Sequence, residues 1–145
     1  MKFVKQIFLL IILISSQTTL QNNELFAQGI VQFKNYVNDE TGTLDQNQIN
    51  TINNSLSSFD RVTSNQVIVY IISSLNGESL EDLSVTLAEK NKIGKKNKNN
   101  GVLMLIVKDD RKIRIEVGYG LEGVLTDAKC SQIIRKDITP EFKSG

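Results

Sequence analysis

The chain has 145 residues, which is the length of a single domain. It contains no histidine and only one cysteine, so Ser-His-Asp and Cys-His catalytic groups and an internal disulfide are excluded, and a zinc site would lack its commonest nitrogen ligand. Its 17 basic and 16 acidic residues nearly balance, which argues against a general nucleic-acid binder, because such proteins carry a surplus of lysine and arginine.

The first segment has the pattern of a secretory signal peptide. Two lysines precede an unbroken apolar run at 7–14, and a polar stretch then leads to the small residue Ala27. The run is shorter than the about 20 residues of a membrane-spanning helix, and an uncleaved anchor is the alternative. We predict a signal peptide over residues 1–27 and an exported domain over residues 28–145, located in a periplasm, a lumen or the extracellular space. Cleavage would remove two basic and one acidic residue and leave 15 of each.

The next segments predict a strand, a helix and a second strand. Residues 31–37 alternate apolar and polar, as in a half-buried strand or an extended lead-in, and residues 38–42 have the composition of a turn. Asp45 and Gln48 have capping-box spacing, and an apolar stripe follows at three- and four-residue steps: Ile49, Ile52, Leu56 and Phe59. The run of mostly β-branched apolar residues at 67–72 predicts a strand that is covered on both faces.

A second helix and a hairpin follow. Ser79 is placed to cap a helix that ends near Gly94, and the lysine-rich segment 90–98 is interpreted as a solvated loop, with a phosphate-binding patch as the less favoured alternative. The apolar run 102–107 predicts another strand. Residues 113–117 alternate, so we expect them to form a strand that pairs antiparallel with its predecessor and exposes Arg114 and Glu116 on a wet face.

A last helix completes the predicted order. Thr126 or Asp127 is placed to cap it, and its apolar residues, Cys130 among them, recur until Pro140. Alternating strands and helices predict an α/β fold in which helices cover a mostly parallel central sheet, with one antiparallel hairpin at its edge.

Three motifs of catalysis and phosphate binding are incomplete or lack the required context. The sequence Gly118–Gly123 satisfies G-x-G-x-x-G, but no helix opens inside it and Glu122 would repel a diphosphate, so a dinucleotide site is disfavoured. Cys130 and Arg135 are one residue too close for a cysteine phosphatase loop, and core packing is the better interpretation of Cys130. Gly94 and its following lysine lack the other residues of a P-loop.

The remaining candidates for a functional site are carboxylates that lie in or beside turns. We expect the loops that carry them to converge at one end of the sheet and to offer oxygen ligands to a hard cation such as Ca²⁺, which takes six to eight oxygens. The competing interpretations are a helix cap for Asp127, a turn former for Asp39 and solvated hairpin residues for the pair at 109–110. The six candidates are Asp39, Asp109, Asp110, Glu116, Glu122 and Asp127.

The sequence also resembles a known family. The segment 110–127, D-R-K-I-R-I-E-V-G-Y-G-L-E-G-V-L-T-D, together with N-G-V-L-M-L at 100–105 and V-N-D-E-T-G-T-L at 37–44, closely resembles the signature of the TPM domain family. The dipeptide Ile93–Gly94 is similar to the one that the family has before its lysine-rich loop. The resemblance spans residues 33 to 145.

The resemblance implies an αβα sandwich with helices on both faces of the sheet, in an exported or membrane-tethered protein. Some members bind Ca²⁺ in a cleft and some have acid phosphatase activity. Carried onto this sequence, the metal candidates (Ca²⁺, or Mg²⁺) are Asp39, Gly120, Glu122 and Asp127, and the catalytic candidates are Asp110 and Arg111. The family domain normally continues past residues 140–145 into another helix, so we expect one sheet face to be incompletely covered.

These points lead to one expectation and one alternative. We expect a monomeric calcium-binding accessory domain that supports a membrane protein or a membrane-associated complex and does not bind nucleic acid. The alternative is a metal-assisted phosphomonoesterase, in which Arg111 offsets developing charge while a carboxylate serves as base. Its weakness is that no residue stands out as a nucleophile and no histidine is present to move a proton.

Overall fold

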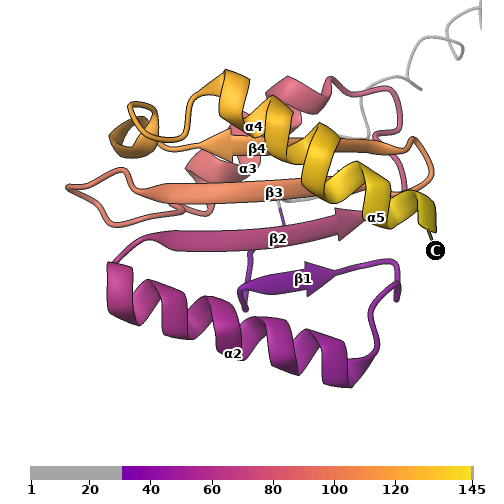
Figure 1. The fold of residues 1–145 in the computed structure, drawn as a ribbon, viewed down its shortest axis with the longest axis horizontal. Helices are drawn as coiled ribbons and strands as arrows, with labels where there is room; N and C mark the ends of the chain where they lie inside the picture. The colour runs from indigo at the N-terminus through magenta and orange to yellow at the C-terminus, as the bar shows by residue number, and fades with distance from the viewer. Residues whose placement is uncertain (1–30, 145) are drawn as a thin grey trace, which may run out of the picture. The chain divides into compact units, whose positions relative to one another are not determined.

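A computed structural model describes residues 31–144, which form a four-stranded sheet with helices on both of its faces (Figure 1). The predicted signal peptide lies outside the described residues. The strands lie in the order β1-β2-β3-β4; the first three are parallel and the last is antiparallel to β3. This arrangement confirms the predicted fold class. The strands are β1 (Val37–Asp39), β2 (Gln66–Ile72), β3 (Gly101–Val107) and β4 (Lys112–Val117).

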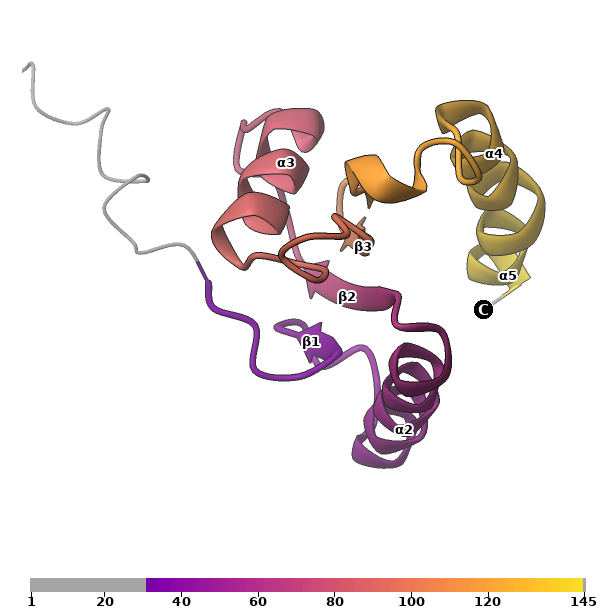
Figure 2. The same cartoon turned by 90° about the vertical axis from the view of Figure 1, so that its left-hand side faces the viewer.

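The helices divide between the two faces of the sheet. Figure 2, which looks along the strands, shows α3 on one face and α2 with α4 and α5 on the other. Among the described residues, no helix is long and apolar enough to cross a membrane. The helical elements are α2 (Gln46–Thr63), α3 (Leu80–Lys90), η1 (Tyr119–Leu121), α4 (Asp127–Ile133), η2 (Ile134–Ile138) and α5 (Thr139–Ser144).

The first strand is short and begins only at the end of residues 31–37, for which the sequence predicts either a half-buried strand or an extended lead-in. Residues 31–36 are a lead-in, and β1 begins at Val37. The strand includes residues 38 and 39, which the sequence assigns to a turn. The lead-in is anchored by Phe33, whose ring is tilted against that of Tyr70 with the ring centroids 5.0 Å apart. The backbone N–H of Phe33 donates to Asn91 Oδ1 at 2.7 Å. Only at the end of the lead-in does a bond to β2 form, where the N–H of Val69 donates to the carbonyl of Tyr36 at 2.7 Å. The alternation of residues 31–36 therefore marks a lead-in and not a strand.

The helix starts follow the predicted capping chemistry. Asp45 caps α2 in a full capping box with Gln48, and Ser79 caps α3 by accepting from the N–H of Asp82. Such caps satisfy backbone donors that a helix start leaves without partners, and each contributes about 1 kcal/mol. The caps fix where the helices leave the sheet and therefore where its connecting loops lie.

The last helix continues past the position where the sequence predicts its end. Ile134–Ile138 form one π-helical turn, in which the backbone N–H of Thr139 donates to the carbonyl of Ile134. Pro140 has no N–H to donate, and it follows this wider turn as the second residue of α5. The wider turn therefore carries the helix across the proline.

The core lies mainly between the sheet and α3. Alternate residues of β2 and β3 point to this face, and each buried leucine or isoleucine contributes about 2 kcal/mol. On the other face Ile71, Val102 and Ile106 are buried, but Val69 and Met104 are only half-buried. The helices on that face expose Phe59, Val62 and Phe142. The face that carries α2 and α5 is thus less completely covered than the α3 face. The buried core residues include Ile68, Tyr70, Ile72, Leu87, Leu103, Leu105 and Val107.

Candidate functional site

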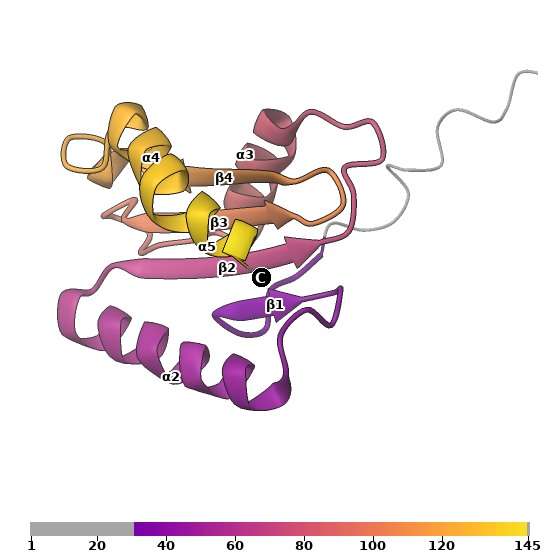
Figure 3. The same ribbon diagram turned by 45° about the vertical axis from the view of Figure 1, so that its right-hand side comes forward.

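The predicted metal ligands and catalytic residues lie at two opposite ends of the sheet; they are Asp39, Gly120, Glu122, Asp127, Asp110 and Arg111. Asp39 ends β1, and Asp110 with Arg111 follows β3, so these three lie at the carboxyl end of the parallel strands. β4 runs back, and the loop after it returns to the start of β3, where the N–H of Gly120 donates to the carbonyl of Asn99 at 3.0 Å. Figure 3 shows the β3–β4 hairpin and the segment leading into α4 at opposite ends.

This arrangement contradicts the expected convergence of the metal candidates. Glu122 follows Gly120, and the turn to Asp127 is held against η1 because Val124 and Leu125 both donate to the carbonyl of Leu121. The seven residues of β3 span about 20 Å. The expectation that Asp39 meets Glu122 and Asp127 around one cation is therefore wrong, because the antiparallel direction of β4 carries its loop to the other end.

Asp39 has a local role in its own turn. Its Oδ1 accepts from the N–H and the hydroxyl of Thr41 at 2.8 and 2.7 Å, and its Oδ2 accepts from the N–H of Leu44 at 2.8 Å. Burial by itself would raise the pKa of Asp39, but these hydrogen bonds, with a further one from Gly42, favour the carboxylate and hold the pKa below its ordinary value. The turn-former interpretation fits Asp39 better than that of a metal ligand.

The carboxylate of Asp110 also accepts a hydrogen bond from neighbouring backbone. Its Oδ2 accepts from the N–H of Leu75 at 2.9 Å, and the hydroxyl of Ser74 lies 3.3 Å from Oδ1. These contacts tie the loop after β2 to the β3–β4 hairpin. The neighbouring Arg111 is exposed and has a φ of 53°, in the left-handed region. The two catalytic candidates thus shape a hairpin, and nothing in their geometry brings a reacting group between them.

The backbone of Arg111 leads to a first prediction. A side chain at a left-handed position costs about 1 kcal/mol, and glycine removes that cost while adding some unfolded-state entropy. We therefore expect Arg111→Gly to raise the free energy of unfolding by about 0.5 kcal/mol in urea titrations. Lys108→Gly, at a position without positive φ, should lower it. A clear loss of stability in Arg111→Gly would show that the arginine side chain makes a contact that matters.

The glycine-rich loop is shaped by close packing. A Cβ at Gly118 would overlap the carbonyl oxygen of Asn99, and one at Gly120 would overlap the carbonyl oxygen of Lys98. Gly118 also donates its N–H to the carbonyl of Gly101 at 2.7 Å. The two glycines therefore let the lysine-rich loop lie directly on the loop after β4, which is a structural reason for their place in the motif.

Glu122 and Asp127 differ from the other carboxylates. Both are exposed, and within residues 31–144 neither side chain accepts a hydrogen bond. Thr126, not Asp127, caps α4, since its side chain accepts from the N–H of Lys129. The Lys129 ammonium group itself donates to the carbonyl of Val124 at 2.8 Å, so a cation of the chain already contacts this turn.

The full predicted metal set does not fit a calcium ion. A calcium shell needs six to eight oxygens around one point, whereas the candidates are divided between two ends of the sheet. Among the described residues, no group of three or more His, Cys, Asp or Glu side chains lies close enough to hold a metal ion. Of the predicted set, Gly120, Glu122 and Asp127 lie at one end of the sheet, and only the last two offer carboxylates there.

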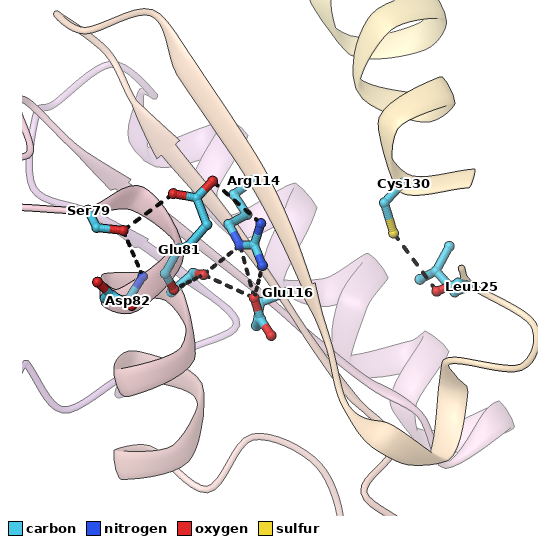
Figure 4. Close-up of polar contacts among 8 residues, drawn as sticks. Ser79, Glu81, Asp82, Arg114, Glu116, Leu125 and Cys130 are labelled. Carbon is cyan, nitrogen blue, oxygen red and sulfur yellow. Dashed lines mark hydrogen bonds and ion pairs between the residues drawn. The ribbon is translucent and has the colours of Figure 1, made fainter. Parts of the chain in front are cut away.

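Cys130 is a core residue, as predicted. It is 5% exposed, and its thiol lies 4.0 Å from the carbonyl of Leu125. Burial, with a smaller contribution from the charge of Asp127, raises the pKa of the thiol, so the reactive thiolate is disfavoured. The close-up in Figure 4 shows Cys130 directed toward Leu125 and apart from the polar cluster of β4 and α3.

That polar cluster lies on the face of β4 that the sequence predicts to be wet. Arg114 and Glu116 face α3, with 31% and 19% of their side chains exposed, and the guanidinium contacts the carboxylate at 2.9 Å (Figure 4). Arg114 Nε donates to the hydroxyl of Ser84, a fully buried residue, at 2.8 Å, and that hydroxyl donates to Glu116 at 3.0 Å.

The expected wet face is therefore an interface between β4 and α3. Ser84 interrupts the apolar stripe of α3 between Leu80 and Leu87, and opposite charges recur two residues apart on β4. In the sequence, these two features together indicate a polar cluster between α3 and β4. Because the guanidinium neutralises the carboxylate inside this interface, Glu116 is not a free metal ligand.

The comparisons with known proteins decide the family. The model of the TPM domain matches residues 37–145, which is more than half of the chain. The chain belongs to the TPM domain family. No curated protein matches it. This membership agrees with the resemblance that the sequence motifs indicate.

Two solved structures are similar to this TPM domain. The solution NMR structure of the N-terminal domain of a protein from P. gingivalis has a TM-score of 0.70 and 36% identity, over 77% of this chain and 71% of that chain. The N-terminal domain of the cg2496 protein from Corynebacterium glutamicum has a TM-score of 0.59 and 18% identity, over 78% of this chain and 72% of that chain. The second likeness supports the fold alone.

A groove lies beside the glycine-rich loop of this TPM domain. It has a volume of about 700 Å³ and is bounded by the C-terminal half of α3, the lysine-rich loop and η1. Its apolar lining includes Val85, Ile93 and Val117, and Tyr119, 79% exposed, stands beside them. This volume lies in the range of ligand sites. The groove and the Glu122–Asp127 turn lie at the same end of the sheet, so this end is the candidate functional site.

Proposed function

We propose that this TPM domain is an exported, non-catalytic accessory domain that binds a membrane protein or a membrane-associated complex, and that the Glu122–Asp127 turn gives it a weak calcium site. The observation that carries the proposal is a difference in hydrogen bonding among the predicted carboxylates. Those of Asp39 and Asp110 are used by neighbouring backbone, whereas those of Glu122 and Asp127 project from one turn without hydrogen-bond donors in the described residues.

The phosphomonoesterase alternative has less support. It needs Arg111 and a bound cation at the same phosphoryl group, but Arg111 lies in the hairpin and the free carboxylates lie at the other end of the sheet. The buried residues Cys130 and Ser84 are both withdrawn from solvent, and the hydroxyl of Ser84 is bonded within the Arg114 cluster. Binding therefore accounts for the arrangement better than turnover.

Calcium is expected to raise the melting temperature modestly. Two carboxylates with backbone carbonyls form an incomplete shell, so we expect a dissociation constant on the order of 1 mM, as in weak extracellular sites. At roughly tenfold excess over that constant, binding adds about 1.4 kcal/mol to the free energy of unfolding. Differential scanning fluorimetry with increasing CaCl₂ measures this, and MgCl₂ tests the choice of ion.

The control for the calcium prediction uses an exposed carboxylate at the other end. Glu122→Gln with Asp127→Asn should abolish the calcium-dependent shift, while Asp109→Asn in the hairpin should retain it. Equal shifts in all three proteins would mean that calcium acts elsewhere. No shift in the unchanged protein would remove calcium from the proposed function.

A further inference from the structure

We infer that the groove between α3 and the glycine-rich loop binds an acidic, amphipathic segment of a partner protein. The inference rests on the proposed role in binding and names the surface and the chemistry of the partner. It assigns a function to the lysine-rich loop, which the sequence predicts to be a solvated connection.

The groove combines an apolar lining with exposed aromatic surface. Val85 is 39% exposed, and Ile93 and Val117 are half-buried, so apolar surface remains accessible inside a concave site. Tyr119 adds a ring that is 79% exposed and carries a polar hydroxyl. Exposed tyrosine beside recessed apolar residues is typical of surfaces where a few anchors dominate binding.

The rim of the groove carries unpaired positive charge. Lys92 and Lys96 are exposed and have no acidic partner within residues 31–144. Lys95 is already paired with Asp60 at 3.3 Å, and Glu116 with Arg114 at 2.9 Å. Glu89 is the one acidic lining residue that lacks such a pair in this part of the structure. The free charge is therefore positive, and carboxylates on the ligand would complement it.

The rim is also held in place before any ligand arrives. Asn100, 5% exposed, accepts from the N–H of Lys95 at 2.9 Å, and Gly94 donates to the side chain of Gln66 at 2.6 Å. The contacts of Gly118 and Gly120 fix the other side of the same loop. A preformed loop loses little conformational entropy on binding, so its lysines can contribute to affinity.

The shape favours a polypeptide segment over a membrane surface. The apolar residues lie within a concavity, and a flat bilayer would reach the lysines of the rim but not Ile93 and Val117. A chain segment with alternating acidic and apolar side chains can place its apolar groups in the groove and its carboxylates beside Lys92 and Lys96. We therefore assign the groove to such a segment.

Fluorescence anisotropy with the full chain tests the inference. The probe is a short fluorescein-labelled peptide in which leucine alternates with glutamate, and its counterpart carries lysine in place of glutamate. The acidic peptide should bind, and the basic one should not. Lys92→Gln with Lys96→Gln should weaken binding about fivefold, as expected for the loss of two exposed ion pairs. Tyr119→Ala should weaken it by a similar factor.

The matched control is Lys108→Gln with Lys112→Gln, which removes two exposed lysines from the hairpin at the opposite end and should leave the affinity unchanged. Equal affinity of all variants, or equal binding of both peptides, would overturn the inference. Binding of phosphatidylglycerol vesicles with the same lysine dependence, but not of the peptide, would replace it by a membrane contact. All titrations contain EDTA, so a failed calcium site leaves this result unaffected.

Discussion

Gly120→Ala is expected to lower the free energy of unfolding by about 3 kcal/mol, because the new methyl group would occupy the place of the Lys98 carbonyl oxygen. Backbone atoms, unlike the end of a flexible side chain, cannot move aside without breaking neighbouring contacts. The hydrogen bond from Gly120 to Asn99 would be lost with the close approach. Urea denaturation followed by circular dichroism measures the change.

A nearby glycine provides the control for this substitution. A Cβ at Gly123 meets nothing within 4 Å, and the backbone there has no positive φ, so Gly123→Ala should be neutral or slightly stabilising. Peptide binding should also fall in Gly120→Ala, since the lysine-rich loop would be displaced. If both alanine variants were equally stable, the glycine motif would need a role other than packing.

Asp39→Ala is expected to cost about 2 kcal/mol at neutral pH, since it removes the acceptor of the hydrogen bonds from Thr41 and Leu44. Asp39→Asn should cost less, because it keeps one acceptor oxygen for Thr41. Chemical denaturation at pH 7 measures both. The turn between β1 and α2 is the part of the structure that should loosen first, and hydrogen exchange at Leu44 would report it.

The same carboxyl group predicts a dependence on pH. The pKa of Asp39 in the folded chain lies below its ordinary value of 3.8. The stabilisation is therefore complete above about pH 4 and is lost as the pH falls through the folded-state pKa. In Asp39→Asn this part of the acid dependence should disappear, whereas Asp109→Asn, at an exposed position, should keep it. An unchanged acid profile in Asp39→Asn would contradict the assignment.

Much of the fold could be predicted because its signals are local. The capping box at Asp45, the apolar strands β2 and β3 and the antiparallel β4 follow from side-chain chemistry and spacing within a few residues. The late start of β1 could not be predicted from the alternating pattern of residues 31–37. That pattern arises because Phe33 and Tyr36 pack against the core, and not because the segment pairs as a strand. The end of the last helix was missed because a π turn is not visible in the spacing.

The candidate site was predicted less well than the fold, for a physical reason. The carboxyl ends of parallel strands meet at one edge of a sheet, but a strand that runs antiparallel delivers its loop to the other edge. The predicted hairpin already placed Glu122 away from Asp39, so the antiparallel direction of β4 was the signal against a shared site. The approach of residues 98–99 to the glycines, in contrast, depends on tertiary contacts that no spacing reveals.

The separation of the two ends has a practical consequence for labelling. The hairpin tip at Asp109 and Arg111 is exposed, and it is about 20 Å along β3 from the lysine rim. A fluorophore or an affinity handle attached there would leave the groove unobstructed. Immobilising the protein through this tip would present the opposite end to a mixture of candidate binding partners, which is the orientation that their capture requires.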